Sequence, residues 1–196
     1  GANALINPAK LRQLAIKKPV ESHDGLDIYE QPQKKHTYAL CVDVAEGQGQ
    51  DYSTFSVIDV TEIPYRQVAK YRNNEIPPML FPTVIFTAAK IAFGLKTTLQ
   101  TKNIGCSNLK ALVEADKLII NDADTIMELS TFSAQKKTFA AEEGSHDDLA
   151  MTLVHFGWLT AQRVFKETIN NNIRQVLQEE QLRIMDADIV PFGIID

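Results

Sequence analysis

The chain has little of several features that would assign its 196 residues to a particular class of protein. Its only cysteines are Cys41 and Cys106, which argues against a disulfide framework. No apolar run is long enough to cross a bilayer, and residues 1–14 lack the apolar core of a signal peptide, so we expect neither a membrane protein nor a secreted one. The string G-x-x-x-x-G-K-[ST], which cradles nucleotide phosphates, does not occur either, and we expect no ATPase activity in this chain.

An excess of positive charge is missing as well. The formal net charge is −5, and this argues mildly against a nucleic-acid partner, which usually meets a basic surface. The acids are unevenly spread, because they gather in residues 43–51, in residues 142–148 and in the C-terminal tail. A metal site would account for the first two groups.

Hydrophobic patterning predicts three consecutive strands at hairpin spacing. Residues 38–44 are apolar on both faces, residues 53–61 alternate, and residues 64–74 form a third strand. The remaining pattern predicts, in order, a helix over 79–93, a basic loop or hairpin over 94–105, a helix over 106–116 with Ser107 as its N-cap, a short strand over 117–122, a helix or mixed piece over 124–132, an acidic loop or short strand over 138–148, a buried helix over 148–165, and a more polar helix over 166–185.

This order is typical of an α/β domain of ribonuclease H type. The expected sheet is mixed, with a three-strand antiparallel meander plus parallel strands, and helices flank it. Such a sheet needs a central parallel strand beside the strand that carries Asp43. Between Lys90 and Gly105, however, no run of about 5–6 β-forming residues exists to supply it.

Three groups of acids are candidates for chemistry. Asp43 lies among core-like neighbours, where a lone carboxylate is costly unless it pairs with another group or binds a metal. The other candidates are Glu46 and Asp51 in the following glycine turn, and Glu142, Glu143, Asp147 and Asp148 before the buried helix. Divalent ions that catalyse phosphoryl transfer prefer such hard oxygen ligands on rigid elements.

Each candidate has an alternative that involves no metal. Asp147 or Asp148 suits the N-cap of the helix that follows, where Asp is favoured. Glu46 and Asp51 fit a turn, and His146 fits a polar loop.

Four segments together resemble a known family, the nuclease domain of the large terminase subunit of tailed bacteriophages, of the myovirus type. They are DVAEGQGQDYSTFSVIDVT (43–61), AKYRNNEIPPMLFPTVIFTAAK (69–90), GCSNLKALVEADKLII (105–120) and AAEEGSHDDLAMTLVHFGWLTAQ (140–162). The resemblance implies a ribonuclease H-like nuclease domain over residues 21–165. Residues 1–20 would then be the end of a linker from a motor domain, and residues 166–196 a C-terminal helix and tail.

The resemblance also implies an activity, with ligands and partners. The chain would be an endonuclease that cuts concatemeric double-stranded viral DNA when capsid filling begins and ends, in the cytoplasm of the infected bacterium. Asp43 matches the first position of the family's acidic triad and Asp147 with Asp148 matches the last; together they would hold two Mg²⁺ or Mn²⁺ ions. Glu46 and Asp51 would be outer ligands, and Lys96 and Lys102 would contact DNA phosphates, although an ordinary exposed hairpin accounts for the two lysines equally well. The motor domain, the portal and the small terminase subunit would be partners.

The family's middle acid belongs to the strand that the pattern does not show. We therefore expect that a segment near residues 90–95 is absent from the sequence, and no residue is assigned the middle role. Two alternatives remain open at this stage: a non-catalytic module that docks on the portal or motor domain, and another ribonuclease H-like nuclease such as a resolvase.

Overall fold

The computed structural model describes residues 3–44, 52–76, 97–171, 174–175 and 178. The chain divides into two compact units, Gly1–Ala161 and Gln162–Asp196. In the second unit, residues 163–171 are helical. Among the described residues, no helix has the length and apolar character that a bilayer crossing requires.

The first unit is built on one large sheet, and the expected antiparallel meander is confirmed. Strand β3 (Tyr38–Asp43) pairs with β4 (Ser53–Asp59), which pairs with β5 (Tyr65–Asn73). The order across the sheet is β1-β2-β5-β4-β3, and β6 (Leu118–Ile119) runs parallel to the start of β5 over two residues. Among the described residues no parallel strand lies beside β3, and the stretch near residues 90–95, where a segment was expected to be absent, is outside them, as is the helix expected over 79–93.

Strands β1 (Glu21–His23) and β2 (Leu26–Ile28) extend the sheet beyond β5, although the polar residues 21–35 were not predicted to form strands. Asp24 and Gly25 form the two-residue turn between them, and both have positive φ angles, 51° and 85°. An Asp-Gly pair at such a turn is the usual hairpin signal. A Cβ atom at Gly25 would lie 2.5 Å from the carbonyl oxygen of Arg72, so the hairpin also needs glycine to approach β5.

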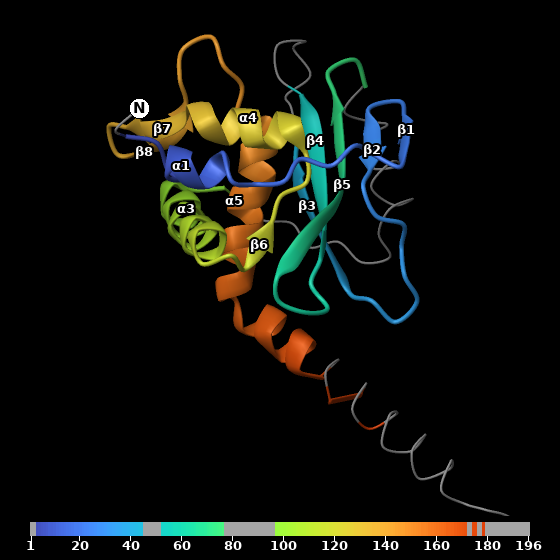
Figure 1. Cartoon of the computed structure of the whole chain (residues 1–196). Helices are drawn as coiled ribbons and strands as arrows, with labels where there is room; N and C mark the ends of the chain where they lie inside the picture. Colours follow the sequence, from blue (N-terminus) through green and yellow to red (C-terminus); the bar gives the residue numbers. More distant parts are fainter. Residues whose placement is uncertain (1–2, 45–51, 77–96, 172–173, 176–177, 179–196) are drawn as a thin grey trace, which may run out of the picture. The chain divides into compact units, whose positions relative to one another are not determined.

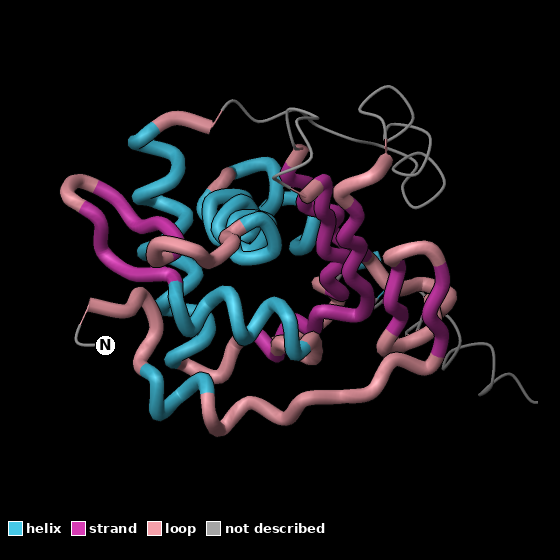
Figure 2. Tube along the Cα trace, turned by 90° about the horizontal axis from the view of Figure 1, so that it is seen from above, coloured by secondary structure: helices cyan, strands magenta, loops and turns pink. Residues whose placement is uncertain are grey.

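The three long helices that the structure describes in this unit cover the same side of the sheet (Figures 1 and 2). They are α3 (Leu99–Glu114), α4 (Ala123–Thr131) and α5 (Asp148–Ala161). The prediction of a buried helix from residue 148 is confirmed, because Leu149, Leu153 and Phe156 are fully buried, but the helix ends at Ala161 and not at residue 165. One turn into α5, the hydroxyl of Thr152 lies 2.7 Å from that of Ser56 on β4.

The start of α3 corrects the sequence prediction. Residues 99–104 were expected to be loop or hairpin, with Ser107 as N-cap, but the helix begins at Leu99 and Thr98 caps it reciprocally with Thr101. Gly105 therefore lies inside the helix, where it meets α5: a Cβ atom there would lie 2.3 Å from the carbonyl oxygen of Val154. The polar start of α3 was misassigned because its glycine, which looks like a helix breaker in sequence, serves a close helix crossing.

Two smaller elements complete the unit. Strands β7 (Phe132–Gln135) and β8 (Thr138–Ala141) form a separate hairpin between α4 and α5. Near the N-terminus, α1 (Pro8–Leu11) is capped by Asn7, and the backbone N–H of Leu5 donates to the carbonyl oxygen of Phe132 at 2.9 Å. Residues before the sheet thus pack within the same unit.

Candidate metal-binding site

Asp43 is the last residue of β3 and is partly buried. It lies opposite Thr54 on β4, which in turn lies opposite Arg72 on β5. Directly opposed residues of antiparallel strands project from the same face of a sheet, with Cβ atoms about 4.5–5.5 Å apart. Asp43, Thr54 and Arg72 therefore form a row across three strands on one face.

That face is the one that α5 covers. The side chain of Thr54 is fully buried, and its Oγ1 donates a hydrogen bond to the backbone carbonyl oxygen of Asp148 at 3.0 Å. Asp148 is the first residue of α5. The N-terminus of this helix, with its tandem acids, is therefore fixed to the residue directly opposite Asp43, and the structure brings the elements that carry the predicted acids to one corner of the sheet.

A second contact ties α5 to the end of β3. The Nδ1 atom of His155 lies 3.1 Å from the carbonyl oxygen of Val42, and its Nε2 lies 3.2 Å from Oγ1 of Thr97. Because a carbonyl oxygen only accepts, Nδ1 must carry the proton, and the Thr97 hydroxyl donates to Nε2. Burial lowers the pKa of His155, which favours this neutral tautomer.

The start of α5 bears on one interpretation of Asp147, that of a helix N-cap. Its backbone carbonyl accepts the first intrahelical hydrogen bond, from the N–H of Met151 at 2.7 Å, so Asp147 occupies the N-cap position. An N-cap aspartate usually accepts with its side chain from the second and third helical N–H groups. Here those groups, of Leu149 and Ala150, donate instead to Oε2 of Glu128 at 2.7 and 3.0 Å.

The carboxylate of Asp147 takes up longer contacts. Its Oδ2 lies 3.4 Å from the backbone N–H of Ala141 on β8 and 3.8 Å from Nζ of Lys102 on α3. The ammonium group of Lys102 also lies 5.4 Å from the centre of the Phe132 ring. A lysine that was expected in a loop is thus in the first turn of a helix, next to one of the predicted acids.

Glu128 is a functional candidate that the sequence analysis missed. It lies on α4 with 6% of its surface exposed, and burial raises its pKa to about 7 although the hydrogen bond from the Ala150 N–H and the charge of Arg72 oppose that rise. The signal in sequence is its place on the buried stripe of α4, which also includes Thr125 and Leu129. A carboxylate on such a stripe needs partners, and here they belong to other elements.

A chain of contacts leads from Glu128 round to Asp148. Arg72 Nη2 lies 3.5 Å from Oε1 of Glu128, and the guanidinium carbon of Arg72 lies 4.0 Å above the centre of the Tyr52 ring. Tyr52 meets the ring of His146 edge to face, with centroids 5.2 Å apart, and His146 Nδ1 lies 3.7 Å from Oδ2 of Asp148. His146, predicted as a loop residue, therefore lies beside one of the tandem acids.

The donors suit a hard divalent cation, since carboxylate oxygens on a strand end and a helix start are the ligands such ions prefer. Among the described residues, however, no group of three His, Cys, Asp or Glu side chains is arranged to hold a metal ion. Glu46, Asp51, Lys96 and the stretch near residues 90–95 lie outside the described residues. The assignment of Asp43, Asp147 and Asp148 to a metal site therefore stays a prediction, and the described residues do not complete such a site by themselves.

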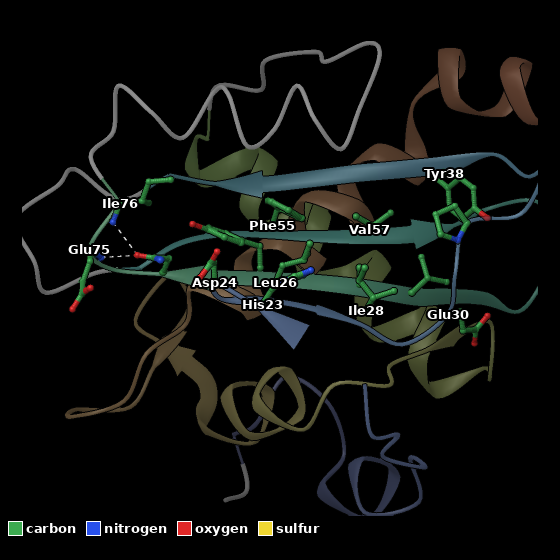
Figure 3. A pocket seen from close by; sticks show the side chains of 15 residues that line it. His23, Asp24, Leu26, Ile28, Glu30, Tyr38, Phe55, Val57, Glu75 and Ile76 are labelled. Atoms are coloured by element: carbon green, nitrogen blue, oxygen red, sulfur yellow. Dashed lines mark hydrogen bonds between the residues drawn. The ribbon is translucent and has the colours of Figure 1, made fainter. Parts of the chain in front are cut away.

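The opposite face of the sheet has a different character. Side chains of neighbouring strand residues alternate between the two faces, so Phe55 and Val57 point away from α5, and they line an apolar groove of about 880 Å³ (Figure 3). The ring of Phe55 stacks on Tyr71 with centroids 5.1 Å apart. Asp43, Asp147 and Asp148 do not line this groove, so it is separate from the corner of the sheet to which the elements carrying these acids come.

Comparison with known proteins bears on the fold. No family model matches the chain. The large terminase nuclease from thermophilic phage G20c, solved with bound magnesium, has a TM-score of 0.63 and 18% identity over 80% of this chain and 97% of that chain. The same nuclease with bound zinc has a TM-score of 0.56 and 19% identity, over 75% of this chain and 94% of that chain. The nuclease domain of the Thermus phage P74-26 large terminase has a TM-score of 0.59 and 20% identity, over 78% of this chain and 93% of that chain. The chain therefore has the fold of the nuclease domains of large terminases.

Proposed function

We propose that this chain is a divalent-metal-dependent endonuclease that cuts concatemeric double-stranded viral DNA at the initiation and completion of capsid filling. The observation that carries the proposal is the bond from Thr54, opposite Asp43, to the backbone of Asp148. The fold neighbours support it, because one such nuclease was solved with magnesium, cobalt and zinc.

In this proposal Asp43, Asp147 and Asp148 hold the cations, Mg²⁺ or Mn²⁺, with Glu46 and Asp51 as outer ligands. The chemistry that two such ions would supply when bound is activation of a water and stabilisation of the leaving oxygen of a phosphodiester. The chain's own residues keep the ligands in place. Thr54 fixes the start of α5, and His155 fixes the backbone next to Asp43.

The remaining roles concern DNA and partners. Lys102 lies next to Asp147 and would face the phosphates of a bound duplex, as would Lys96. Such contacts position DNA without reading its sequence. The motor domain, the portal and the small subunit of a terminase are the partners that this function requires, in the cytoplasm of an infected cell, with residues 1–20 leading from the motor domain.

Cleavage of supercoiled plasmid in the presence of Mn²⁺ or Mg²⁺ tests the proposal. We expect the unaltered chain to nick and linearise plasmid, EDTA to stop it, and Asp43→Asn to abolish cleavage while the far-ultraviolet circular dichroism spectrum is unchanged. Asp116→Asn, which removes an exposed acid at the far end of α3, should cut normally. Equal cleavage by the unaltered chain and the Asp43 variant would exclude the metal role, and a folded chain that never cuts would favour a docking module.

A further inference from the structure

We propose that Glu128 is a positioning residue of this site: it caps helix α5 from helix α4 and thereby leaves the carboxylate of Asp147 available to a cation. The proposal rests on the proposed function for the identity of the ligand. The capping of α5 by Glu128 in place of Asp147 is argued from the geometry alone.

The carboxylate of Glu128 accepts the hydrogen bonds that the carboxylate of Asp147 would ordinarily accept as N-cap. Asp147 has the backbone position of an N-cap, and the N–H groups that its side chain would ordinarily receive belong to Leu149 and Ala150. Both donate to the same oxygen of Glu128, at 2.7 and 3.0 Å. Without Glu128, two buried N–H groups would need another acceptor, and the adjacent carboxylate of Asp147 is the natural one.

Glu128 is itself held in a defined place. It comes from the buried stripe of α4, and Arg72 approaches its second oxygen at 3.5 Å. Arg72 is in turn covered by Tyr52, with 4.0 Å between the guanidinium carbon and the ring centre. Arg72 belongs to the same row of the sheet as Thr54 and Asp43, so one set of contacts links the cap to the strand that carries the first acid.

Because Glu128 caps α5, the carboxylate of Asp147 makes only longer contacts among the described residues. Its Oδ2 contacts are 3.4 Å to the Ala141 N–H and 3.8 Å to the ammonium of Lys102, both longer than the 2.7 and 3.0 Å bonds that Glu128 accepts. A ligand in loose contacts exchanges them for a metal at lower cost than one that caps a helix. Groups that orient metal ligands commonly change metal affinity about 10–100-fold when they are removed.

The test uses three variants of the chain, with Mn²⁺ alone as the probe. Glu128→Ala removes the cap, and we expect it to bind Mn²⁺ at least about tenfold more weakly by electron paramagnetic resonance of the free ion. Glu128→Gln keeps an acceptor oxygen for Leu149 and Ala150, and we expect it to restore most of the affinity. Thr152→Val removes a buried hydroxyl one turn further along α5, and it should lower the unfolding temperature without weakening Mn²⁺ binding.

A double-mutant cycle in EDTA tests the capping exchange without metal or activity. In the unaltered chain, Asp147→Ala should shift the unfolding temperature little, because Glu128 caps the helix. In the Glu128→Ala background the same change should shift it clearly, because Asp147 has become the cap.

The outcomes separate the two proposals. Unchanged Mn²⁺ affinity in Glu128→Ala, or an additive cycle, would overturn the positioning role while plasmid cleavage by the unaltered chain kept the nuclease proposal intact. Equal loss of affinity in Glu128→Ala and Glu128→Gln, with both folded, would also overturn it, since the cap would then not be what matters. If the unaltered chain bound no Mn²⁺ but the cycle showed coupling, the capping exchange would stand and the proposed function would fail.

Discussion

Thr54 and Asp148, which are 94 residues apart in the chain, are joined by a 3.0 Å hydrogen bond from the Oγ1 atom of one to the backbone carbonyl oxygen of the other. Through this bond the sheet determines where α5 begins. Since Thr54 is also opposite Asp43, a single threonine relates the two acidic segments that the sequence singled out.

Replacing Thr54 by valine should loosen that relationship. Valine keeps the shape of threonine but cannot donate, so we expect a loss of about 0.5–1.5 kcal/mol in the free energy of unfolding and weaker Mn²⁺-supported cleavage. Urea unfolding and plasmid cleavage measure the two effects. Thr138→Val is the matched control, because the buried hydroxyl of Thr138 makes no hydrogen bond within the described part of the chain, and its loss should cost nothing. Equal stability of the Thr54 variant would contradict the importance of the bond.

The N-terminus of α3 gives a second pair of variants. Thr98→Ala removes a reciprocal cap and should cost about 1 kcal/mol of stability. Ser107→Ala, inside the helix and exposed, should be neutral or slightly stabilising, because alanine is the better helix former. Unfolding in urea distinguishes them, and a larger loss for Ser107 would mean that the helix begins where the sequence suggested.

The crossing of α3 and α5 predicts an unusual response to alanine. Gly→Ala inside a helix ordinarily stabilises it, but a Cβ atom at Gly105 would lie 2.3 Å from the Val154 carbonyl oxygen, and one at Gly157 would lie 2.4 Å from that of Gly105. We therefore expect each substitution to cost about 1–3 kcal/mol, because the helices must move apart. Thermal unfolding tests this, and a gain in melting temperature for either variant would exclude the close crossing.

Stability at acid pH should depend on Asp59, at the other end of β4. Burial raises the pKa of this carboxyl, but hydrogen bonds from Thr61 and His36 outweigh burial and hold the pKa below its ordinary value. Arg66 also lies 2.9 Å away. A carboxyl whose folded pKa is lowered stabilises the fold above its unfolded pKa, near 3.9, and loses that contribution as pH falls through the folded value.

The unaltered chain should therefore unfold at a higher temperature than Asp59→Asn at pH 7, and the difference should narrow below about pH 4. Glu62→Gln, which changes an exposed acid nearby, should show no such pH-dependent difference. A gap between the Asp59 variant and the unaltered chain that stayed constant down to pH 3 would show that Asp59 acts by packing, not by charge.

Parts of the fold were predictable because their signals are local. The meander follows from apolar and alternating runs, and α5 follows from its nearly continuous apolar sequence. The β1–β2 hairpin had a local signal too, the Asp24-Gly25 turn, but its strands are only three residues long. The start of α3 was lost because Gly105 looks like a helix breaker unless its neighbour α5 is known.

The residues of the candidate site also differ in whether the sequence alone reveals them. Asp43, Asp147 and Asp148 stand out in sequence as carboxylates at the end of a strand and the start of a helix. Glu128 does not, because its meaning depends on α5, which begins 20 residues later, and on Arg72, which precedes it by 56 residues.

The order of residues alone determined the three-strand meander, the helix α5 and the acids that border them, because side-chain periodicity is a local signal. Only the tertiary structure decided which carboxylate caps α5. That choice depends on two buried N–H groups and the nearest acceptor in space, and α4 brings that acceptor from elsewhere in the sequence.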